Sequence, residues 1–534
     1  MKETINEKGQ EIKSRGLRLL KQGKRGLVRV LFSRTGLVTL LLLFNIGLLV
    51  LFQLRLIDLI PPSLVGTVVG GFVMVMALYL LNSDMDPTSK ITWLVLISLF
   101  PTVGAPLYFY VKSELGHRVL KRRLNQLVKQ TRSALPQSIS TLERLKEQAP
   151  DEAPLANYLQ KVGCHPVYDQ CRLTYFSCGE EKFEALKEQL ESAKRFIFLE
   201  YFIIDEGRMW GEVLEILARK AKKGVEVRLM YDGSCEFTTL THDYPERLRQ
   251  LGIHCKVFSP ATPVVSTHYN YRDHRKIAVI DGCTAFTGGV NLADEYINEF
   301  PKYGHWKDAA VMVEGEAVRS FTLMFLQLWN VAERAPEFTR WLMAHSDRYH
   351  VEKGFVIPYG DCPLDEHRVG ERVYMDILNR ARSYVHIMSP YLILDGELET
   401  ALCFAAQRGV DVKLILPGIP DKKTPYALAK TYYKPLLDAG VEIYEYRPGF
   451  VHSKVFVSDD IRGVVGTINL DYRSLYHHFE CAAYLYDCGC LSHMEADFQR
   501  TLEDCRRVDE NQLRSRPWKQ KLTGWLMKAI APLF

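Results

Sequence analysis

The chain has 534 residues, of which 47% are hydrophobic and 25% charged, so it is long enough for a membrane module and two packed domains. The formal net charge of +5 sits largely in the amino-terminal arm; it fits attraction to anionic lipid and argues against a nucleic-acid binder. The sequence contains no phosphate-binding loop and no dinucleotide-type glycine spacing, so no cofactor is expected.

The first 111 residues are predicted to form a membrane region. Residues 1–35 are a basic arm with ten Lys or Arg, too long and too basic for a simple signal peptide. Residues 36–111 then hold three stretches without a charged residue, 36–53, 64–81 and 91–111, which approach or reach the length of a bilayer span. The pattern predicts amino-terminal transmembrane helices in a multi-pass protein.

Basic residues on both sides of this region predict its orientation. The arm and segment 112–123 are both basic and should stay in the cytoplasm, which requires an even number of crossings. One stretch must then be re-entrant or interfacial. The candidates are 91–111, which Pro101 and Pro106 interrupt, and 36–53.

Cysteine usage favours the same cytoplasmic placement of the catalytic region. All twelve cysteines lie between Cys164 and Cys505, scattered in a way typical of free buried thiols. The spacing Cys488-Gly489-Cys490 is too short for zinc, and no second pair or flanking histidine completes a site. No metal is expected.

Two segments outside the main domains have helical character. Residues 112–160 are predicted to be a charged helical linker, with leucines at helical spacing. Residues 513–534 are predicted to be an amphipathic tail, in which Trp518, Trp525 and other apolar residues alternate with lysines. This tail is typical of a helix at a membrane interface, and packing against the body of the protein is the alternative.

The rest of the chain contains an internal repeat. Residues 196–233 are predicted to form a strand, a loop, a helix, a Lys-Gly turn and a strand, and residues 384–418 follow the same order. We therefore expect two homologous α/β/α sandwich halves, residues 161–345 and 346–512, with mixed, largely parallel sheets covered by helices.

Each half carries the motif His-x-Lys-x-x-x-x-Asp. The two copies are HRKIAVID, from His274 to Asp281, and HSKVFVSD, from His452 to Asp459. Each is followed by a glycine turn that ends in an asparagine 17 residues after its histidine. The duplication predicts one active site that takes a His, a Lys and an Asn from each half. These residues are His274, Lys276, Asn291, His452, Lys454 and Asn469.

These residue types suit a phosphate diester. Apolar residues after each lysine predict a buried strand, along which His and Lys point to one face. Two ammonium groups would balance the negative charge, and the asparagines would donate hydrogen bonds to the non-bridging oxygens. One imidazole can attack phosphorus while the other protonates the leaving alkoxide. Asp281 and Asp459 are counted with the catalytic residues because they complete the motifs, although bracing the fold or the lysines is the favoured role.

Beyond the twin motifs, segments 270–296 and 469–480 resemble the phospholipase D superfamily, and within it the bacterial cardiolipin synthases. The resemblance implies a covalent phosphohistidine and an acidic residue that orients each histidine. Asp308 and Glu480 occupy those positions, and we expect them to pair crosswise, Asp308 with His452 and Glu480 with His274. Surface acids are the alternative interpretation. Which histidine is the nucleophile stays open.

The resemblance also implies an activity and a place in the cell. The expected reaction joins two phosphatidylglycerols into cardiolipin and releases glycerol, at the plasma membrane of a bacterium. A phospholipase D-type phosphodiester hydrolase is the alternative, because the two enzymes differ only in the nucleophile that resolves the phosphohistidine. A scaffold with an inactive site is disfavoured by the intact His, Lys and Asn of both halves. The expected partners are phosphatidylglycerol and anionic membrane lipids, and no nucleic acid.

Overall fold

The computed structural model describes residues 62–112, 118–260, 271–343 and 352–533. Contacts between these residues separate two compact units. One contains residues 120–260, 271–343 and 352–525, and the other contains residues 62–112, 118–119 and 526–533. The basic arm 1–35 and the apolar stretch 36–53 lie outside the described residues.

The smaller unit is built from three helices of the predicted membrane region. They are α4 (Pro62–Leu81), α5 (Pro87–Leu99) and α6 (Pro101–Lys112). Stretch 64–81 lies within α4, whereas stretch 91–111 is divided between α5 and α6 because Pro101 starts a new helix. Gly104 lets α6 approach α5, since a Cβ at this position would lie 2.8 Å from the carbonyl oxygen of Leu96. None of the helices in the described part of the chain combines the length and the apolar composition that a bilayer crossing needs.

The larger unit contains two sheets with the same strand order. The first sheet runs β1-β9-β7-β6-β2-β3-β4, and the second runs β10-β17-β16-β15-β11-β12-β13 and then adds β18. The strands of the first sheet are β1 (Arg172–Phe176), β2 (Phe196–Tyr201), β3 (Glu226–Asp232), β4 (His254–Phe258), β6 (Lys276–Ile280), β7 (Thr284–Gly288) and β9 (Ala310–Glu314). The strands of the second are β10 (Phe355–Asp361), β11 (Tyr384–Met388), β12 (Asp411–Pro417), β13 (Glu442–Tyr446), β15 (Val455–Ser458), β16 (Arg462–Gly466), β17 (His478–Tyr486) and β18 (Cys505–Arg507). The matching order shows that the two halves repeat one topology.

Both sheets are mixed, but the prediction that they are largely parallel is wrong. In the first sheet only the pairs β2–β3 and β3–β4 are parallel. Along the strand order given for the second sheet only β11–β12 and β12–β13 are parallel. The remaining neighbours within each sheet are antiparallel. The parallel part is the strand–helix–strand unit seen in the sequence. The antiparallel part begins with the motif strands β6 and β15, which return through tight turns.

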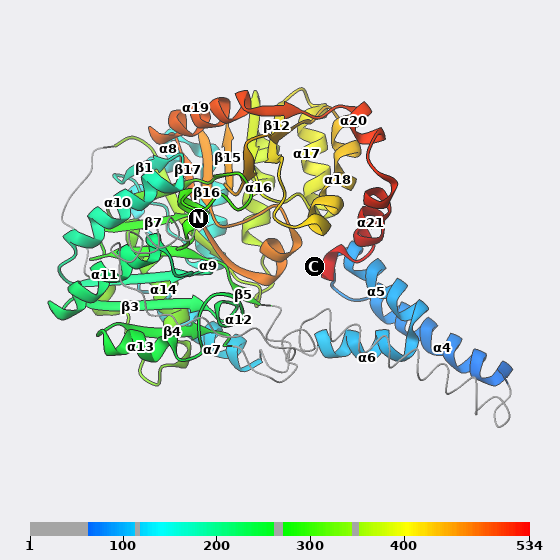
Figure 1. The fold of residues 1–534 in the computed structure, drawn as a ribbon, viewed down its shortest axis with the longest axis horizontal. Helices are drawn as coiled ribbons and strands as arrows, with labels where there is room; N and C mark the ends of the chain where they lie inside the picture. The colour runs from blue at the N-terminus through cyan, green and yellow to red at the C-terminus, as the bar shows by residue number, and fades with distance from the viewer. Residues whose placement is uncertain (1–61, 113–117, 261–270, 344–351, 534) are drawn as a thin grey trace, which may run out of the picture. The chain divides into compact units, whose positions relative to one another are not determined.

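Helices cover the sheets on both faces. In the first half α10 (Gly179–Ser192), α11 (Arg208–Lys222) and α13 (Tyr244–Gln250) pack on the face of β2 that carries Ile197 and Leu199. In the second half α17 (Gly396–Gln407) occupies the position that α11 has in the first. It lies next to α16 (Val369–Arg380) and α18 (Lys423–Asp438) (Figure 1). On α16, Tyr374 stacks on Phe456 of β15 with 3.9 Å between ring centroids.

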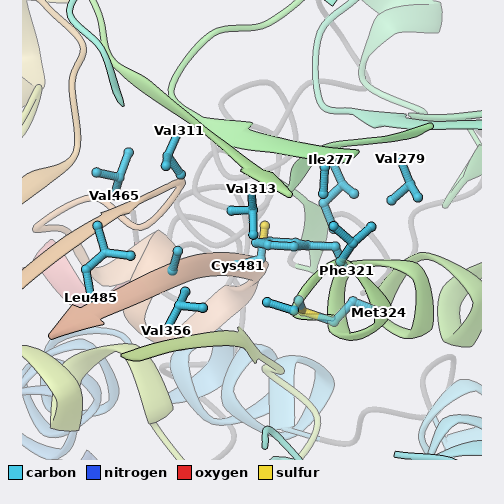
Figure 2. Packing of buried hydrophobic residues seen from close by; sticks show 14 of the residues in the cluster. Ile277, Val279, Val311, Val313, Phe321, Met324, Val356, Val465, Cys481 and Leu485 are labelled. Atoms are coloured by element: carbon cyan, nitrogen blue, oxygen red, sulfur yellow. The ribbon is translucent and has the colours of Figure 1, made fainter. Parts of the chain in front are cut away.

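A shared hydrophobic core joins the two halves. Valines of β9 and β6 in the first sheet meet Val465, Cys481 and Leu485 of the second, around Phe321 and Met324 of α14 (Val318–Trp329) (Figure 2). The helix α19 (Cys490–Glu503) adds Met494 and Phe498 to the same cluster. Because this core draws on both sheets, the halves fold as one unit, and residues at their junction are held in place from both sides.

The predicted linker and tail are helical. Residues 118–163 contain α7 (Arg118–Thr131), α8 (Ile139–Gln148) and α9 (Ala153–Gly163), whose leucines Leu124, Leu127 and Leu145 are buried. The tail contains α20 (Glu510–Arg514) and α21 (Trp518–Lys528). All twelve cysteines are free thiols.

Candidate active site

Two short parallel ladders cross between the halves and carry the motif histidines. In one, β5 (Arg272–Asp273) pairs with the start of β17, so that Arg272 faces His478 and Asp273 faces Phe479. In the other, β14 (Gly449–Val451) pairs with β8 (His305–Lys307), with Val451 facing Lys307. One residue further along each register, His274 comes opposite Glu480 and His452 comes opposite Asp308. Backbone hydrogen bonds extend both ladders to this point, from the His274 amide to the Phe479 carbonyl (2.9 Å) and from the His452 amide to the Lys307 carbonyl (2.7 Å).

Each histidine contacts the carboxylate of the other half. Nδ1 of His274 lies 2.9 Å from Oε1 of Glu480, and Nδ1 of His452 lies 2.7 Å from Oδ2 of Asp308. This is the crossed pairing expected from the sequence. Both carboxylates are fully buried, so the surface-acid interpretation is wrong. A carboxylate bound at Nδ1 fixes the ring orientation and leaves Nε2 as the reactive nitrogen.

The motif lysines lie beside their own histidines. Lys276 begins β6 and Lys454 directly precedes β15, and each Nζ donates to the backbone carbonyl of the histidine two residues earlier. Nζ of Lys454 also lies 3.0 Å from Nδ1 of His452. Burial lowers the pKa of Lys276 to about 8 and that of Lys454 to about 7. The two ammonium groups are thus held in a dry environment, where they interact strongly with an anion.

The two imidazoles share one electropositive environment. Burial holds the pKa of His274 well below its usual value, and the charges of Lys276, Lys454 and His452 lower it further. Burial and Lys454 lower the pKa of His452 to about 4, against the opposing effect of Asp308. Both rings are therefore neutral near pH 7 without substrate, which leaves each with a lone pair at Nε2.

The two predicted asparagines are buried in different surroundings. Asn291 follows β7; its Oδ1 accepts from the amide of Ile203 (3.0 Å) and its Nδ2 donates to the hydroxyl of Tyr296 (2.7 Å). One N–H of its amide is therefore already engaged. Asn469, in the equivalent position after β16, has a buried Oδ1 without a hydrogen-bond partner among the described residues.

The glycine turns differ between the halves, and each fits its own acid. A Cβ at Gly289 would lie 1.9 Å from Oδ1 of Asp308, so this carboxylate requires a glycine there. The equivalent residue is Thr467, whose hydroxyl donates to Oε2 of Glu480 and accepts from the amide of Cys481 (3.0 Å). The second turn has Gly466-Thr467 where the first has Gly288-Gly289, and this difference adds a hydrogen bond to an active-site carboxylate.

The carboxylates of Asp281 and Asp459, which complete the two motifs, accept hydrogen bonds from backbone amides. Asp281 directly follows β6, at the far end from Lys276, with φ +54°, and its carboxylate accepts from the backbone amides of residues 194, 195 and 196 at 2.7–2.9 Å. Asp459 makes the same three contacts, each 2.9 Å long, with the amides of residues 382, 383 and 384. At about 3.3 Å per strand residue these carboxylates lie well away from the lysines. They fasten the start of β2 and β11, which is the fold-bracing role favoured from the sequence.

Aromatic rings lie beside both motif histidines, and three of them, Phe202, Tyr296 and Trp306, were not predicted to be site residues from the sequence. The ring of His452 lies between Trp306 (5.2 Å between centroids) and Tyr296 (5.4 Å). The ring of His274 lies beside Phe202 (4.9 Å) and His478 (5.2 Å). Trp306 and His478 occupy equivalent positions, two residues before Asp308 and Glu480. This common offset from the two acids is present in the sequence. It indicates a place beside the histidines only when the acids are known to lie opposite the histidines.

Two family models match the chain. The model described as cardiolipin synthase, PLD-like domain, matches residues 186–329 and 374–502, and the model described as phospholipase D-nuclease N-terminal matches residues 71–112. The two copies of the first model cover the two halves of the larger unit.

Several proteins are similar to this chain over most of their length. The chain is 32% identical to a cardiolipin synthase of Alkalihalophilus pseudofirmus over 454 residues, 84% of this chain and 90% of that protein. It is 32% identical to a cardiolipin synthase of Geobacillus kaustophilus over 463 residues, 86% of this chain and 92% of that one. An uncharacterized protein of Streptococcus mutans is 56% identical over 458 residues, 85% of this chain and 99% of its own length.

A solved structure shares the fold. The crystal structure of phosphatidylserine synthase from Haemophilus influenzae aligns with a TM-score of 0.53 at 15% identity, and covers 68% of this chain and 95% of that one. At this identity the likeness concerns the architecture of the paired halves alone.

Proposed function

The chain belongs to the cardiolipin synthases of the phospholipase D superfamily, and on this basis we propose that it joins two phosphatidylglycerols into cardiolipin through a phosphohistidine. The observation that carries the proposal is the pair of crossed contacts, in which each histidine is oriented at Nδ1 by a buried carboxylate of the other half. Two histidines prepared in the same way suit a reaction in which one acts as nucleophile and the other as acid and base.

In the first proposed step, Nε2 of His274 attacks the phosphorus of one phosphatidylglycerol. The P–O bond to glycerol breaks, and His452 delivers a proton from Nε2 to the departing alkoxide. His452 must be protonated for this role, although its pKa is about 4 in the empty site. We expect the pKa to rise on binding, because the phosphodiester anion offsets the two ammonium charges that act on the imidazole.

In the second step the roles reverse. Neutral His452 takes the proton from the terminal hydroxyl of a second phosphatidylglycerol, and the resulting alkoxide oxygen attacks the phosphohistidine. The P–N bond breaks, which frees His274 and leaves cardiolipin. Lys276 and Lys454 would hold the phosphoryl oxygens in both steps, together with the free amide protons of Asn291 and Asn469. The near symmetry of the halves allows the two histidines to exchange roles.

The test is a transferase assay on the purified enzyme in detergent, with labelled phosphatidylglycerol as sole lipid and EDTA present. We expect cardiolipin and glycerol in equal amounts, a ³²P-labelled enzyme intermediate that is stable to base and labile to acid, and loss of product in His274→Ala and His452→Ala. His493→Ala, an exposed histidine on α19, is the matched control. Phosphatidic acid with no cardiolipin would mean that water resolves the intermediate and would replace the synthase by a hydrolase.

We also propose that the enzyme works at the bacterial plasma membrane, held there by segment 36–111 with two crossings and a cytoplasmic catalytic unit. Exposed apolar side chains on α4, including Val68, Met74 and Val75, support contact with lipid. The tail supports it too. On α21, Gly524 packs against the α18 backbone, while Trp518 and Trp525 are 68% and 71% exposed. Lysines and no acidic residue lie on α21, which suits an anionic lipid surface.

The placement of the tail can be measured by tryptophan fluorescence in liposomes that contain brominated phosphatidylglycerol. We expect quenching to weaken in Trp518→Phe and Trp525→Phe. Trp329→Phe, a buried core position, is the matched control and should keep the wild-type quenching. Equal quenching in all four proteins would contradict contact of α21 with lipid. Labelling of Cys403 by an impermeant thiol reagent in inside-out vesicles, and not in intact cells, would place the catalytic unit in the cytoplasm.

A further inference from the structure

One side of the active site contains a third imidazole that the proposed reaction does not use. His478 is buried beside Glu480 and His274, with its Nδ1 3.5 Å from Oε1 of Glu480. That nitrogen has no hydrogen-bond partner among the described residues. We propose that His274, His478 and Glu480 form a binding site for zinc or a similar divalent transition-metal ion, and that occupation of this site inhibits the enzyme.

The geometry is close to that of a metal site. One ligand atom from each of the three side chains lies within 4.8 Å of the other two. Four ligands about 2.0–2.1 Å from a tetrahedral zinc ion are about 3.3 Å apart, and two histidines with one glutamate are a common zinc set with the fourth position open. The observed separations from Oε1 of Glu480, 2.9 Å to Nδ1 of His274 and 3.5 Å to Nδ1 of His478, lie on either side of that value.

The other half of the site cannot bind a metal in this way. The position equivalent to His478 is Trp306, whose indole N–H donates to Oδ2 of Asp308 (3.3 Å). An indole N–H is a donor only and offers no lone pair. The two motif histidines have the same motif and the same kind of acid partner, but they differ in their sensitivity to a metal ion. Only His274 can become a ligand of the proposed site.

Metal binding would disable His274 without any covalent change. Neutral His274 carries its proton on Nδ1, where Glu480 accepts it. When a metal ion takes the Nδ1 lone pair, the proton of the neutral ring resides on Nε2, so the nitrogen that faces phosphorus has no lone pair to donate. Glu480 exchanges its hydrogen bond to His274 for a bond to the ion. Removing the ion restores both contacts, so the inhibition is reversible.

Nearby charges limit the affinity. Lys276, Lys454 and Arg473 all act on this part of the site and repel a dication. We therefore expect binding in the micromolar range, far weaker than the affinity of a structural zinc site. Bound phosphodiester and bound metal should also compete, because both use the space beside His274. The claim of inhibition rests on the proposed function, whereas the claim of binding does not.

The binding test uses Co²⁺ as a spectroscopic probe and the full-length protein stripped of metal. We expect one equivalent to give visible absorption bands of nitrogen and oxygen coordination, without the near-ultraviolet band of a thiolate ligand. His478→Asn should lose these bands, and His477→Asn, the neighbouring histidine outside the set, should retain them. A thiolate band, or an unchanged spectrum in His478→Asn, would overturn the proposal.

The inhibition test measures cardiolipin formation against Zn²⁺, each variant relative to its own rate in EDTA. We expect the half-inhibiting concentration to rise at least about tenfold in His478→Asn, as loss of one ligand should cost no less than loss of an outer-shell partner. His477→Asn should match the wild type, and EDTA should restore full activity. Equal inhibition of all three proteins would overturn the proposal. Metal binding by a protein that makes no cardiolipin in EDTA would refute the proposed function and leave the metal site standing.

Discussion

Asp308 accepts a hydrogen bond from Nδ1 of His452 across the junction of the two halves, at 2.7 Å and fully shielded from water. The same relationship holds between Glu480 and His274. In both pairs the acid and the histidine belong to different motif copies.

Replacing Asp308 by Asn should disable the site and leave the fold intact. The amide has the shape of the carboxylate, but its NH₂ group would favour the tautomer of His452 that carries the proton on Nε2. We expect kcat to fall about 10²- to 10⁴-fold, the range seen when an orienting carboxylate is lost. The transferase assay measures the effect, and an unchanged melting temperature confirms folding. A kcat within a few-fold of wild type would remove Asp308 from its positioning role.

The close approach of Gly289 to Asp308 gives a second prediction. Gly289→Ala should lower activity by a comparable factor, because the new methyl group would displace the carboxylate from His452. In the other half, Thr467→Ser keeps the hydroxyl that donates to Glu480 and should stay active, whereas Thr467→Val should lose part of the activity. Equal activities of the serine and valine variants would show that this hydroxyl does not act through Glu480.

Asp281 and Asp459 should affect stability more than chemistry. Asp281→Ala leaves three backbone amides at the start of β2 without their acceptor, which we expect to cost about 1–3 kcal/mol of unfolding free energy. The rate per folded molecule should stay close to wild type at low temperature. Thermal unfolding and activity measured on the same samples separate the two effects. Loss of kcat at an unchanged melting temperature would return Asp281 to the catalytic residues.

Burial of Lys454 predicts how stability depends on pH. Its pKa is lowered from 10.5 to about 7, so between these values the unfolded chain holds a proton that the folded chain has released. The unfolding free energy should therefore rise with pH across this window, and the destabilising effect should be complete below pH 7. One pKa unit corresponds to about 1.4 kcal/mol, so a shift of roughly 3.5 units gives a rise on the order of 5 kcal/mol.

Lys454→Met removes this proton and should flatten that part of the pH dependence. The measurement is the melting temperature of both proteins from pH 6 to about pH 10, in which we expect the variant to be the more stable at pH 6 and to lose the advantage as pH rises. Lys423→Met, at an exposed position on α18, should follow the wild type throughout. Parallel curves for wild type and Lys454→Met would mean that the ammonium group is not buried as described.

The sequence predicted the twin motifs, their histidines and lysines, and the repeated strand–helix–strand units, because these depend on fixed local spacing. It did not predict the antiparallel half of each sheet, although a signal was present. Asp281-Gly282-Cys283 is a three-residue connection between β6 and β7 with Asp-Gly at its start, a pattern typical of a hairpin. The residue that completes each motif thus belongs to a turn, which also explains why its carboxylate caps a neighbouring strand.

Other features of the site could not be read from the sequence. Trp306 and His478 lie beside the motif histidines because of the register of two ladders. These ladders join segments more than 130 residues apart in the chain. The burial of Asp308 follows from the same register and from the missing side chain at Gly289. Local periodicity carries no information about pairings of this range.

The pairing of short strands across the two halves limits which substitutions the protein can accept during evolution. A duplicated domain is normally free to lose the residues of one copy, since the other copy still functions. Here each copy holds the acid and the pairing strand that the histidine of the other copy requires. A substitution in one half therefore alters the surroundings of the histidine in the other half. Selection acts on both copies at once, so the two copies must evolve together. Halves expressed as separate polypeptides would be catalytically silent until they reassociate.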